Sequence, residues 1–313
     1  MKTPILFLIF NRPDTTQKVF DVIKQIKPKY LFVAADGPRE NKSGEKELCE
    51  QTKQIVLKNI DWDCEVKTLF REKNLGCGKA VSEAIGWFFE SVEKGIILED
   101  DCLPDKSFFS FCEELLEKYR YNEKIFMISG NNFLPNHPNP KESYYFSEIA
   151  HIWGWATWKR AWKKYDFFMK NLPIFLKNKE IEKKIKNKEV ANYYIDRLND
   201  VYKKRIDTWD YQWLYTIWNF NGLSIVPKHN LISNIGFNKD ATHTKNSNSK
   251  YSNLKTGNIT FPLHHPNKIE CNKLFDDYEH NILINKKYIF LKKILKSIGL
   301  FEIIRYIYLK IKK

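Results

Sequence analysis

Apolar runs of strand length alternate with amphipathic helical segments through the first 130 residues, and this alternation constrains the fold most. The run 4–10 (PILFLIF) is continuously apolar, which is typical of a strand buried on both faces. The segment after it places Val19, Ile23 and Ile26 on one helical stripe. Repeated strand–helix units predict an α/β fold, with a mostly parallel sheet flanked by helices. The expected strands are 4–10, 30–37, 64–72, 96–101 and 125–130, and the expected helices are 14–27, 45–60, 78–95 and 106–120.

The second half of the chain is less regular. Residues 151–166 are dense in tryptophan, and the spacing of Trp155, Trp158 and Trp162 favours a helix that packs in the core. A lysine-rich stretch at 170–190 predicts a solvated helix and connector. The remaining expectations are an aromatic helix at 209–220, a strand-like segment at 222–237 and a polar loop at 238–253.

The composition allows a large globular core but names no partner. The 313 residues are 43% hydrophobic, and the formal net charge is +14. Lysine-rich solvated surfaces explain such a charge, and so does attraction to phosphates, acidic glycans or an anionic membrane. Both explanations stay open, and no feature calls for a nucleic acid partner.

The cysteines and the N-terminus both favour a cytoplasmic protein. No C-x-x-C pair is present and no cysteine has histidines at zinc spacing, so buried reduced thiols are expected. The apolar run near the N-terminus covers only residues 5–10 and is followed by no small-residue cleavage site. It is therefore interpreted as a first buried strand rather than a signal peptide. The cysteines are Cys49, Cys64, Cys77, Cys102, Cys112 and Cys271.

Polar residues follow four of the expected strands. In open α/β sheets, ligands bind outside the carboxyl ends of the strands. These strand ends should therefore converge on one binding edge. They carry Asn11 and Arg12, Asp36 and Gly37, the segment 74–76, and the triplet Glu99, Asp100 and Asp101.

Three adjacent carboxylates after a buried strand call for a counter-charge. Unpaired carboxylates raise one another's pKa and cost stability, and a divalent cation such as Mn²⁺ or Mg²⁺ relieves this. Strand alternation predicts that Glu99 and Asp101 face one side and Asp100 the other. The alternative is an acidic turn whose aspartates cap the next helix.

Two further features suit a nucleotide diphosphate. Arg12 can pair with phosphate in a fork geometry. The segment 74–79 (NLGCGK) places Gly76 and Lys79 at a helix start, where backbone N–H groups attract anions. By itself this segment is equally consistent with a plain helix-start turn. The chain lacks both G-x-x-x-x-G-K-[ST] and G-x-G-x-x-G after its first strand, so Walker-type NTPase and Rossmann dehydrogenase assignments are weak.

With these residues the chain resembles the GT-A-fold glycosyltransferases. The stretch ILEDDCLPDKSFFSF, AADG after the second strand and Arg12 after the first are most similar to the N-acetylglucosaminyltransferase I group. The resemblance extends through IWGWATW and the stretch beginning TWDYQW, and covers about residues 1–240. It implies a nucleotide-sugar-binding half (1–130), an acceptor-binding and catalytic half (131–260) and a C-terminal extension (261–313).

The resemblance also implies roles for single residues. Asp101 would ligate the metal, and Glu99 and Asp100 would orient the nucleotide. Asp210 would be the general base for inversion, with Asp207 as the fallback. The remaining nucleotide-sugar contacts would come from Asn11, Arg12, Asp36, Gly76 and Lys79, with Asp36 accepting a hydrogen bond from uracil.

Later residues complete the predicted site. His243 is proposed as a second metal ligand, against the alternative of an ordinary loop histidine, with Asp240 and Thr244 beside it. Trp153, Gly154 and Trp155 are candidates for contacting the acceptor, because tryptophan faces stack on sugars.

The last 28 residues, 286–313, form a basic amphipathic segment with no apolar run long enough to span a bilayer. Such a segment suits an anionic membrane surface and a lipid-linked acceptor, and it equally suits a helix docked on the protein body. We therefore expect a cytoplasmic, metal-dependent inverting transferase that moves sugar from a UDP-sugar to a glycan or lipid-linked saccharide in polysaccharide synthesis. A peripheral position on the inner face of the plasma membrane is the variant that the basic segment adds. The alternatives are a sugar-phosphate nucleotidyltransferase and a non-catalytic polyanion- or membrane-binding protein.

Overall fold

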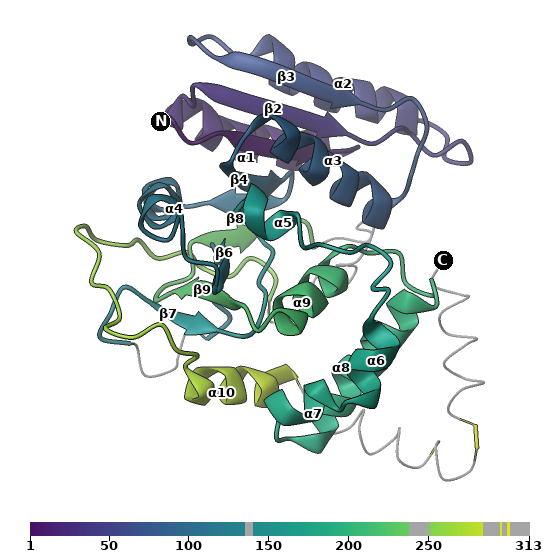
Figure 1. Cartoon of the computed structure of the whole chain (residues 1–313). Helices are drawn as coiled ribbons and strands as arrows, with labels where there is room; N and C mark the ends of the chain where they lie inside the picture. Colours follow the sequence, from purple (N-terminus) through teal and green to yellow (C-terminus); the bar gives the residue numbers. More distant parts are fainter. Residues whose placement is uncertain (135–139, 238–248, 250, 284–294, 296–298, 301–313) are drawn as a thin grey trace.

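An eight-stranded mixed sheet with helices on both faces organises the computed structural model of this chain (Figure 1). The structure describes residues 1–134, 140–237, 249, 251–283, 295 and 299–300. The strand order is β3-β2-β1-β4-β8-β6-β9-β7. The strands are β1 (Ile5–Ile9), β2 (Tyr30–Ala35), β3 (Glu65–Phe70), β4 (Lys94–Glu99), β6 (Ile125–Ser129), β7 (Tyr144–Ser147), β8 (Trp155–Trp158) and β9 (Leu223–Pro227).

Strands β1 to β4 are parallel to one another, as the strand–helix alternation predicts. Strands β8 and β7 run antiparallel to their neighbours, whereas β6 and β9 pair in parallel. The sheet is therefore mainly parallel and continuous across the two halves of the chain. Because β4 lies beside β1, which lies beside β2, the carboxyl ends of these three strands meet at one edge.

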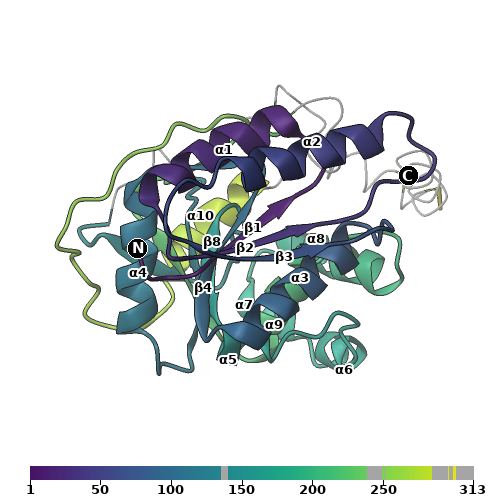
Figure 2. The ribbon, with the colours of Figure 1, turned by 90° about the horizontal axis from the view of Figure 1, so that it is seen from above.

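Two layers of helices cover the sheet (Figure 2). Helices α1 (Pro13–Ile26), α2 (Glu45–Lys58) and α4 (Ser107–Lys118) lie on one face. Helices α3 (Cys77–Ser91), α5 (Lys159–Trp162) and α9 (Asp210–Asn219) lie on the other. The predicted fold class, an α/β sheet flanked by helices, is confirmed.

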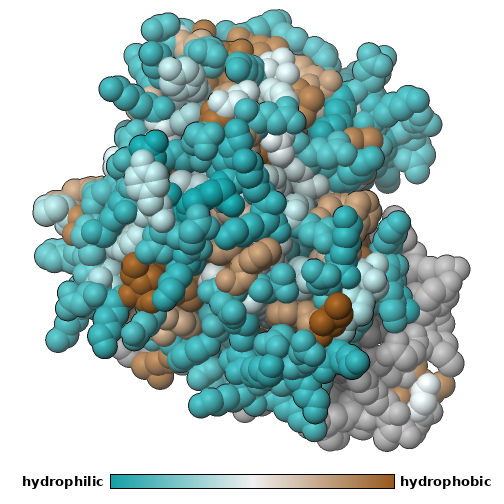
Figure 3. All heavy atoms as spheres, in the orientation of Figure 1, coloured by the Kyte–Doolittle hydropathy of each residue, from teal (hydrophilic) through white to brown (hydrophobic). Residues whose placement is uncertain are grey.

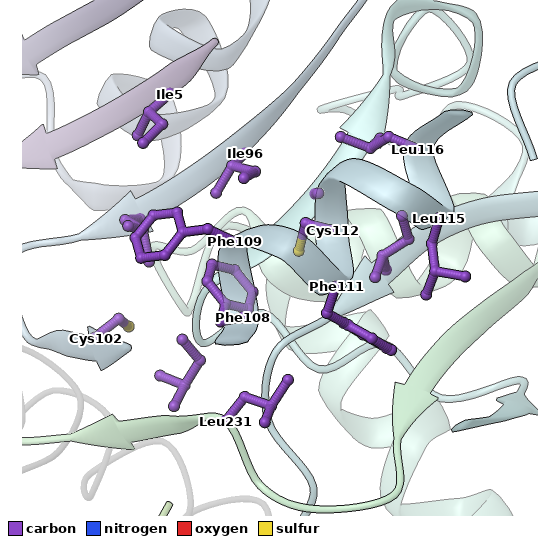
Figure 4. Packing of buried hydrophobic residues seen from close by; sticks show 14 of the residues in the cluster. Ile5, Ile96, Cys102, Phe108, Phe109, Phe111, Cys112, Leu115, Leu116 and Leu231 are labelled. Carbon is purple, nitrogen blue, oxygen red and sulfur yellow. The ribbon is translucent and has the colours of Figure 1, made fainter. Parts of the chain in front are cut away.

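The core follows the two-residue alternation of the strands. In β1, Phe7 belongs to the cluster under α1 and α4, whereas Leu6 and Leu8 belong to the cluster under α3 and α9. Phe108 and Phe109 of α4 pack towards the sheet, as Figure 4 shows. Both faces of the central strands are thus buried, which explains their continuous apolar sequences.

Helices α6 (Leu172–Lys177), α7 (Glu180–Lys184) and α8 (Lys188–Tyr202) build a further cluster against α9. The stretch 170–190 is therefore more than a solvated helix and connector, since Phe175 and Ile181 are buried in that cluster. Helix α10 (Lys273–Leu283) packs on β7 and α8.

Two local expectations were wrong. Residues Trp155 to Trp158 form β8 rather than a helix, because they fill the gap between β4 and β6 and exchange ladder hydrogen bonds with both. The expected single strand at 222–237 is two strands, β9 and β10 (Ile232–Asn234). Strand β10 leaves the main sheet and pairs with β5 (Cys102–Pro104) directly after the acidic triplet.

The described surface is mostly hydrophilic on the face seen in Figure 3, with small separate apolar patches. Within the described residues, no helix combines the length and the apolar character needed to cross a membrane. All six cysteines are free, and Cys49, Cys102 and Cys112 are buried, as expected for reduced thiols. Most of the basic segment 286–313 lies outside the described residues.

Candidate active site

The acidic triplet stands at the end of β4, opposite the end of β1. Glu99 is the last residue of β4, and Asp100 and Asp101 form the turn into β5. Arg12 follows β1 and donates from Nη1 to Asp101 Oδ2 over 2.8 Å and from Nη2 to Asp100 Oδ1 over 2.5 Å. The backbone N–H of Phe10 donates to the other oxygen of Asp100 over 3.1 Å. The arginine predicted to hold phosphate thus also bridges two carboxylates.

The alternating side-chain directions predicted for the triplet do not continue beyond the end of the strand. Asp100 and Asp101 both reach Arg12, because the two-residue period ends with β4 at Glu99. The triplet does not cap the following helix either. Asp105 does so, accepting the backbone N–H of Ser107 over 2.8 Å. The capping role that the alternative gave to the aspartates of the triplet is therefore wrong.

The triplet holds more negative charge than Arg12 can balance. Burial and the nearby charge of Asp101 raise the pKa of Glu99 to about 8, although Arg12 opposes this shift. Burial raises the pKa of Asp100 to about 6, again against the effect of Arg12. Glu99 Oε1 is enclosed and has no hydrogen-bond partner among the described residues. A set of oxygen ligands with one unpartnered carboxylate oxygen and uncompensated charge fits a divalent cation.

Asp36 ties the end of β2 to the start of α3. Its carboxylate accepts the backbone N–H groups of Leu75 and Gly37 over 3.0 Å and that of Gly76 over 3.1 Å. Burial raises its pKa, although these hydrogen bonds act in the opposite direction. Asp36 therefore lies at the predicted edge, and its carboxylate accepts hydrogen bonds from the backbone of the turn 74–76.

Asp207 makes a similar contact from the other half of the chain. Its Oδ1 accepts the backbone N–H of Gly78 over 3.0 Å. A Cβ atom at Gly76 would lie 2.5 Å from Asp207 Oδ2, and Gly76 has φ +81°, so both the space and the backbone require glycine there. Three of the backbone N–H groups in segment 74–79 that were candidates for phosphate binding therefore already donate hydrogen bonds to carboxylates of this chain.

Asp210 is the first residue of α9 and faces the same edge. Its Oδ1 accepts the backbone N–H of Tyr211 over 2.9 Å and the hydroxyl of Thr208. Oδ2 of Asp210 has no hydrogen bond within the described part of the chain. The segment just before α9 lies against the start of α3, since an added Cβ at Gly78 would come within 2.6 Å of the backbone oxygen of Thr208. The charge of Asp210 also contributes to the raised pKa of Glu99.

Cys77 is the first residue of α3. Burial raises the pKa of its thiol, and so do the charges of Glu99, Asp207 and Asp210. Lys79 points elsewhere: it is exposed, and its Nζ lies 3.7 Å from Glu83 on the same helix.

Sequence reasoning missed three residues of the edge. Gly236 follows β10 and lies on the Arg12–Asp101 pair, where an added Cβ would come within 2.1 Å of Asp101 Oδ2. Glu45, at the start of α2, is a buried carboxylate that accepts the side-chain amide of Asn11 over 2.8 Å. It also binds Arg39. The polar motif DGPRE (36–40) directly after β2 is the sequence signal that could have indicated Arg39. The sequence around Glu45 carries no local signal of its burial.

The predicted acceptor residues separate into two kinds. Trp155 is completely buried and stacks on Trp209 with 5.6 Å between ring centroids, so it belongs to the core and offers no face to an acceptor. Gly154 is also buried, with φ +60°, and an added Cβ would lie 2.5 Å from Ile232. Trp153 is half-buried and packs edge-on against Phe237. Of the three, Trp153 alone keeps an accessible ring.

The second predicted metal ligand, His243, lies outside the described residues, as do Asp240 and Thr244. A different group, Glu148, Cys271 and Asp276, comes close enough together to hold an ion. It lies beside β7, away from the triplet, and its carboxylates have protein partners. Glu148 pairs with Lys184 and Lys273, and Asp276 accepts the hydroxyl of Ser147 over 2.6 Å. We interpret this group as the tie between α10 and the sheet.

No protein-family model and no curated protein matches this chain. Solved structures similar to it include S. aureus TarS 1–349, with 13% identity, TM-score 0.37, and 53% of this chain and 50% of that chain covered. A cytidylyltransferase from Leptospira borgpetersenii has 14% identity, TM-score 0.33, and coverages of 53% and 64%. Mouse xyloside xylosyltransferase 1 has 11% identity, TM-score 0.33, and coverages of 71% and 82%. This chain thus spans about half of the TarS fragment.

Proposed function

We propose that this protein is a metal-dependent inverting glycosyltransferase of the GT-A fold that uses a UDP-sugar donor. The observation that carries the proposal is the Glu99–Asp100–Asp101 triplet, paired with Arg12 at the carboxyl edge of the sheet, together with Asp210 at the start of α9, whose preceding segment contacts the start of α3. The first group suits a metal-bound diphosphate, and the second suits a general base. The acceptor would be a hydroxyl of a glycan or lipid-linked saccharide.

The triplet and Arg12 would hold the diphosphate end of the donor. Asp101 would be the principal metal ligand, and Glu99, whose Oε1 is buried without a hydrogen-bond partner among the described residues, would be the second candidate. A bound Mn²⁺ or Mg²⁺ supplies charge neutralisation for the departing nucleoside diphosphate. Arg12, held by Asp100 and Asp101, lies where its guanidinium can pair with a phosphate oxygen.

Asp210 would take the proton of the acceptor hydroxyl at Oδ2. Its Oδ1 is held by Thr208 and Tyr211, which fixes the carboxylate and leaves the second oxygen for the acceptor. One base is sufficient because the hydroxyl displaces the nucleotide in a single inverting step. Asp207 is the weaker candidate, since its Oδ1 accepts the N–H of Gly78 and its Oδ2 packs against Gly76.

Binding of nucleotides tests the donor site. Thermal unfolding with UDP, CDP and GDP, with and without Mn²⁺, should show a stabilisation that needs both UDP and metal and that disappears in Asp101→Ala. The absence of any response to a nucleoside diphosphate would refute the proposal.

A reaction assay separates glycosyl transfer from nucleotidyl transfer. Incubation with UDP-sugars and saccharide acceptors should release UDP, whereas incubation with nucleoside triphosphates and sugar 1-phosphates should release no pyrophosphate. The opposite pattern would assign the same metal-binding edge to a sugar-phosphate nucleotidyltransferase.

A further inference from the structure

Arg39, which follows β2 at the predicted binding edge, is held in an unusually complete way by Glu45. The carboxylate of Glu45 accepts the backbone N–H of Arg39 over 2.7 Å and its Nε over 3.0 and 3.1 Å, and it also contacts Nη2. Glu45 is 4% exposed and is itself held by Asn11 over 2.8 Å. The guanidinium orientation is therefore fixed by a buried group that ties together the ends of β1 and β2.

The fixed guanidinium still has one free end. Nη1 of Arg39 has no hydrogen-bond partner in the described part of the chain, and its side chain is 40% exposed. Its Cζ lies 5.7 Å from the ring centroid of Phe10, whose backbone N–H binds Asp100 of the triplet. Arg39 thus lies on the same edge as the triplet, on the β2 side of it.

The order of the strands indicates which part of the donor reaches Arg39. The triplet ends β4, and β1 separates β4 from β2. Two strand spacings amount to roughly 10 Å, which is about the distance from a diphosphate to the far side of its nucleoside. A diphosphate at the triplet therefore directs the nucleoside towards the segment that carries Asp36 and Arg39.

The net charge of the Arg39–Glu45 pair also indicates the nucleoside as the part of the donor that reaches Arg39. The Arg39 guanidinium and the Glu45 carboxylate together carry no net charge, so they offer an oriented N–H donor rather than a positive centre. Such a donor suits an uncharged oxygen, as in a pyrimidine carbonyl or a ribose, better than a phosphate. Arg12, beside the metal-binding carboxylates, is the arginine placed for phosphate.

From these contacts we propose that Arg39 is a nucleoside-binding residue, with Nη1 donating to an uncharged oxygen of the base or ribose, and that Glu45 and Asn11 position it. This inference rests on the proposed use of a UDP-sugar. It adds a specificity determinant that the resemblance to known transferases did not supply.

The experiment compares uridine, UMP and UDP as ligands, with Mn²⁺ present, by calorimetry for UDP and ligand-observed NMR competition for the weaker two. Arg39→Met should weaken all three by the same factor, about three- to tenfold, as expected for one lost hydrogen bond to an uncharged partner. Lys46→Met is the matched control, because it also replaces a cationic side chain with methionine, at an exposed position one residue beyond Glu45, and it should leave all three affinities unchanged.

Two further variants distinguish the loss of this contact from a general loss of folding. Arg39→Lys keeps the charge and the aliphatic stem but removes the planar guanidinium with its several N–H donors, and it should weaken binding as Arg39→Met does. Glu45→Gln should reproduce part of the loss, because Arg39 is then less firmly oriented. A loss confined to UMP and UDP would make Arg39 a phosphate contact, and unchanged affinities would remove it from the site; either result overturns the inference. Failure of the wild type to bind any uridine compound would instead refute the proposed function.

Discussion

Arg12 donates from Nη1 to Oδ2 of Asp101 across 2.8 Å, so the proposed metal ligand already has a cationic partner. The same guanidinium contacts Asp100, whose side chain is almost completely buried. Any divalent cation that binds Asp101 has to share this carboxylate with Arg12 or displace it. Metal binding at Asp101 would therefore be coupled to Arg12 through the Asp101 carboxylate.

Arg12→Met should destabilise the metal-free protein by roughly 2–3 kcal/mol, because it leaves two buried carboxylates without their counter-charge while Arg12 itself is one-quarter exposed. Mn²⁺ should restore more stability to the variant than it adds to the wild type, since the competing cation is gone. Denaturant unfolding with and without Mn²⁺ measures both effects. Lys18→Met, at an exposed position of α1, is the control, and equal Mn²⁺ effects in wild type and Arg12→Met would contradict the coupling.

Asp210→Asn should lower sugar transfer by about 10²–10⁴-fold, the contribution of a positioned general base. UDP binding should be retained, because Thr208 and Tyr211 can still donate to the amide oxygen. Asp207→Asn is the matched variant three residues earlier, and it should keep transfer within a few-fold, since its amide oxygen can still accept the N–H of Gly78. Steady-state rates together with UDP affinities check the pair. The reverse outcome would move the base to Asp207.

Gly236→Ala should weaken metal-dependent UDP binding and cost about 1–3 kcal/mol of stability, because the added methyl group meets both Asp101 and Arg12. Gly86→Ala provides the contrast. Gly86 lies inside α3, and the nearest atom to an added Cβ is 4.0 Å away. This second substitution should therefore stabilise the protein by roughly 0.5–1 kcal/mol. Thermal unfolding and UDP titration of the two variants test the close approach of β10 to the triplet.

Buried His151 should make the free energy of unfolding depend on pH in a way that is independent of the candidate active site. Burial lowers the pKa of His151, but the charge of Glu279 and the 2.7 Å hydrogen bond to it outweigh this effect and raise the pKa above 6.5. A raised pKa in the folded state means that the pair contributes fully below pH 6.5 and loses its contribution as the pH rises through the folded-state pKa.

In Glu279→Gln the buried imidazole loses its counter-charge, so burial alone should lower its pKa and reverse the sign of this contribution. The difference in unfolding free energy between wild type and variant should therefore shrink as the pH rises from 6 to 9. Denaturant titrations at several pH values measure this difference, in which other titrating groups largely cancel. A difference that stays constant with pH would exclude a charged His151.

The sequence by itself determined the parallel part of the sheet and the residues at its carboxyl edge. Continuous apolar runs fixed β1 (Ile5–Ile9), β2 (Tyr30–Ala35) and β4 (Lys94–Glu99) to within two residues at each end, because strands buried on both faces leave an unbroken local signal. The same runs located Arg12, Asp36 and the acidic triplet at strand ends, where parallel topology brings them together. The roles of these residues in binding stay predictions.

Tertiary structure decided everything that depends on contacts between distant segments. Residues Trp155 to Trp158 carry helical spacing, yet they form β8 because the sheet has an open position between β4 and β6 that only a strand can fill. Likewise, Glu45 is buried where its carboxylate accepts the side-chain amide of Asn11, 34 residues earlier. The close approach of Gly236 to Asp101 depends on the pairing of β10 with β5. No local pattern encodes such contacts, since each arises from how two segments far apart in the chain share one volume.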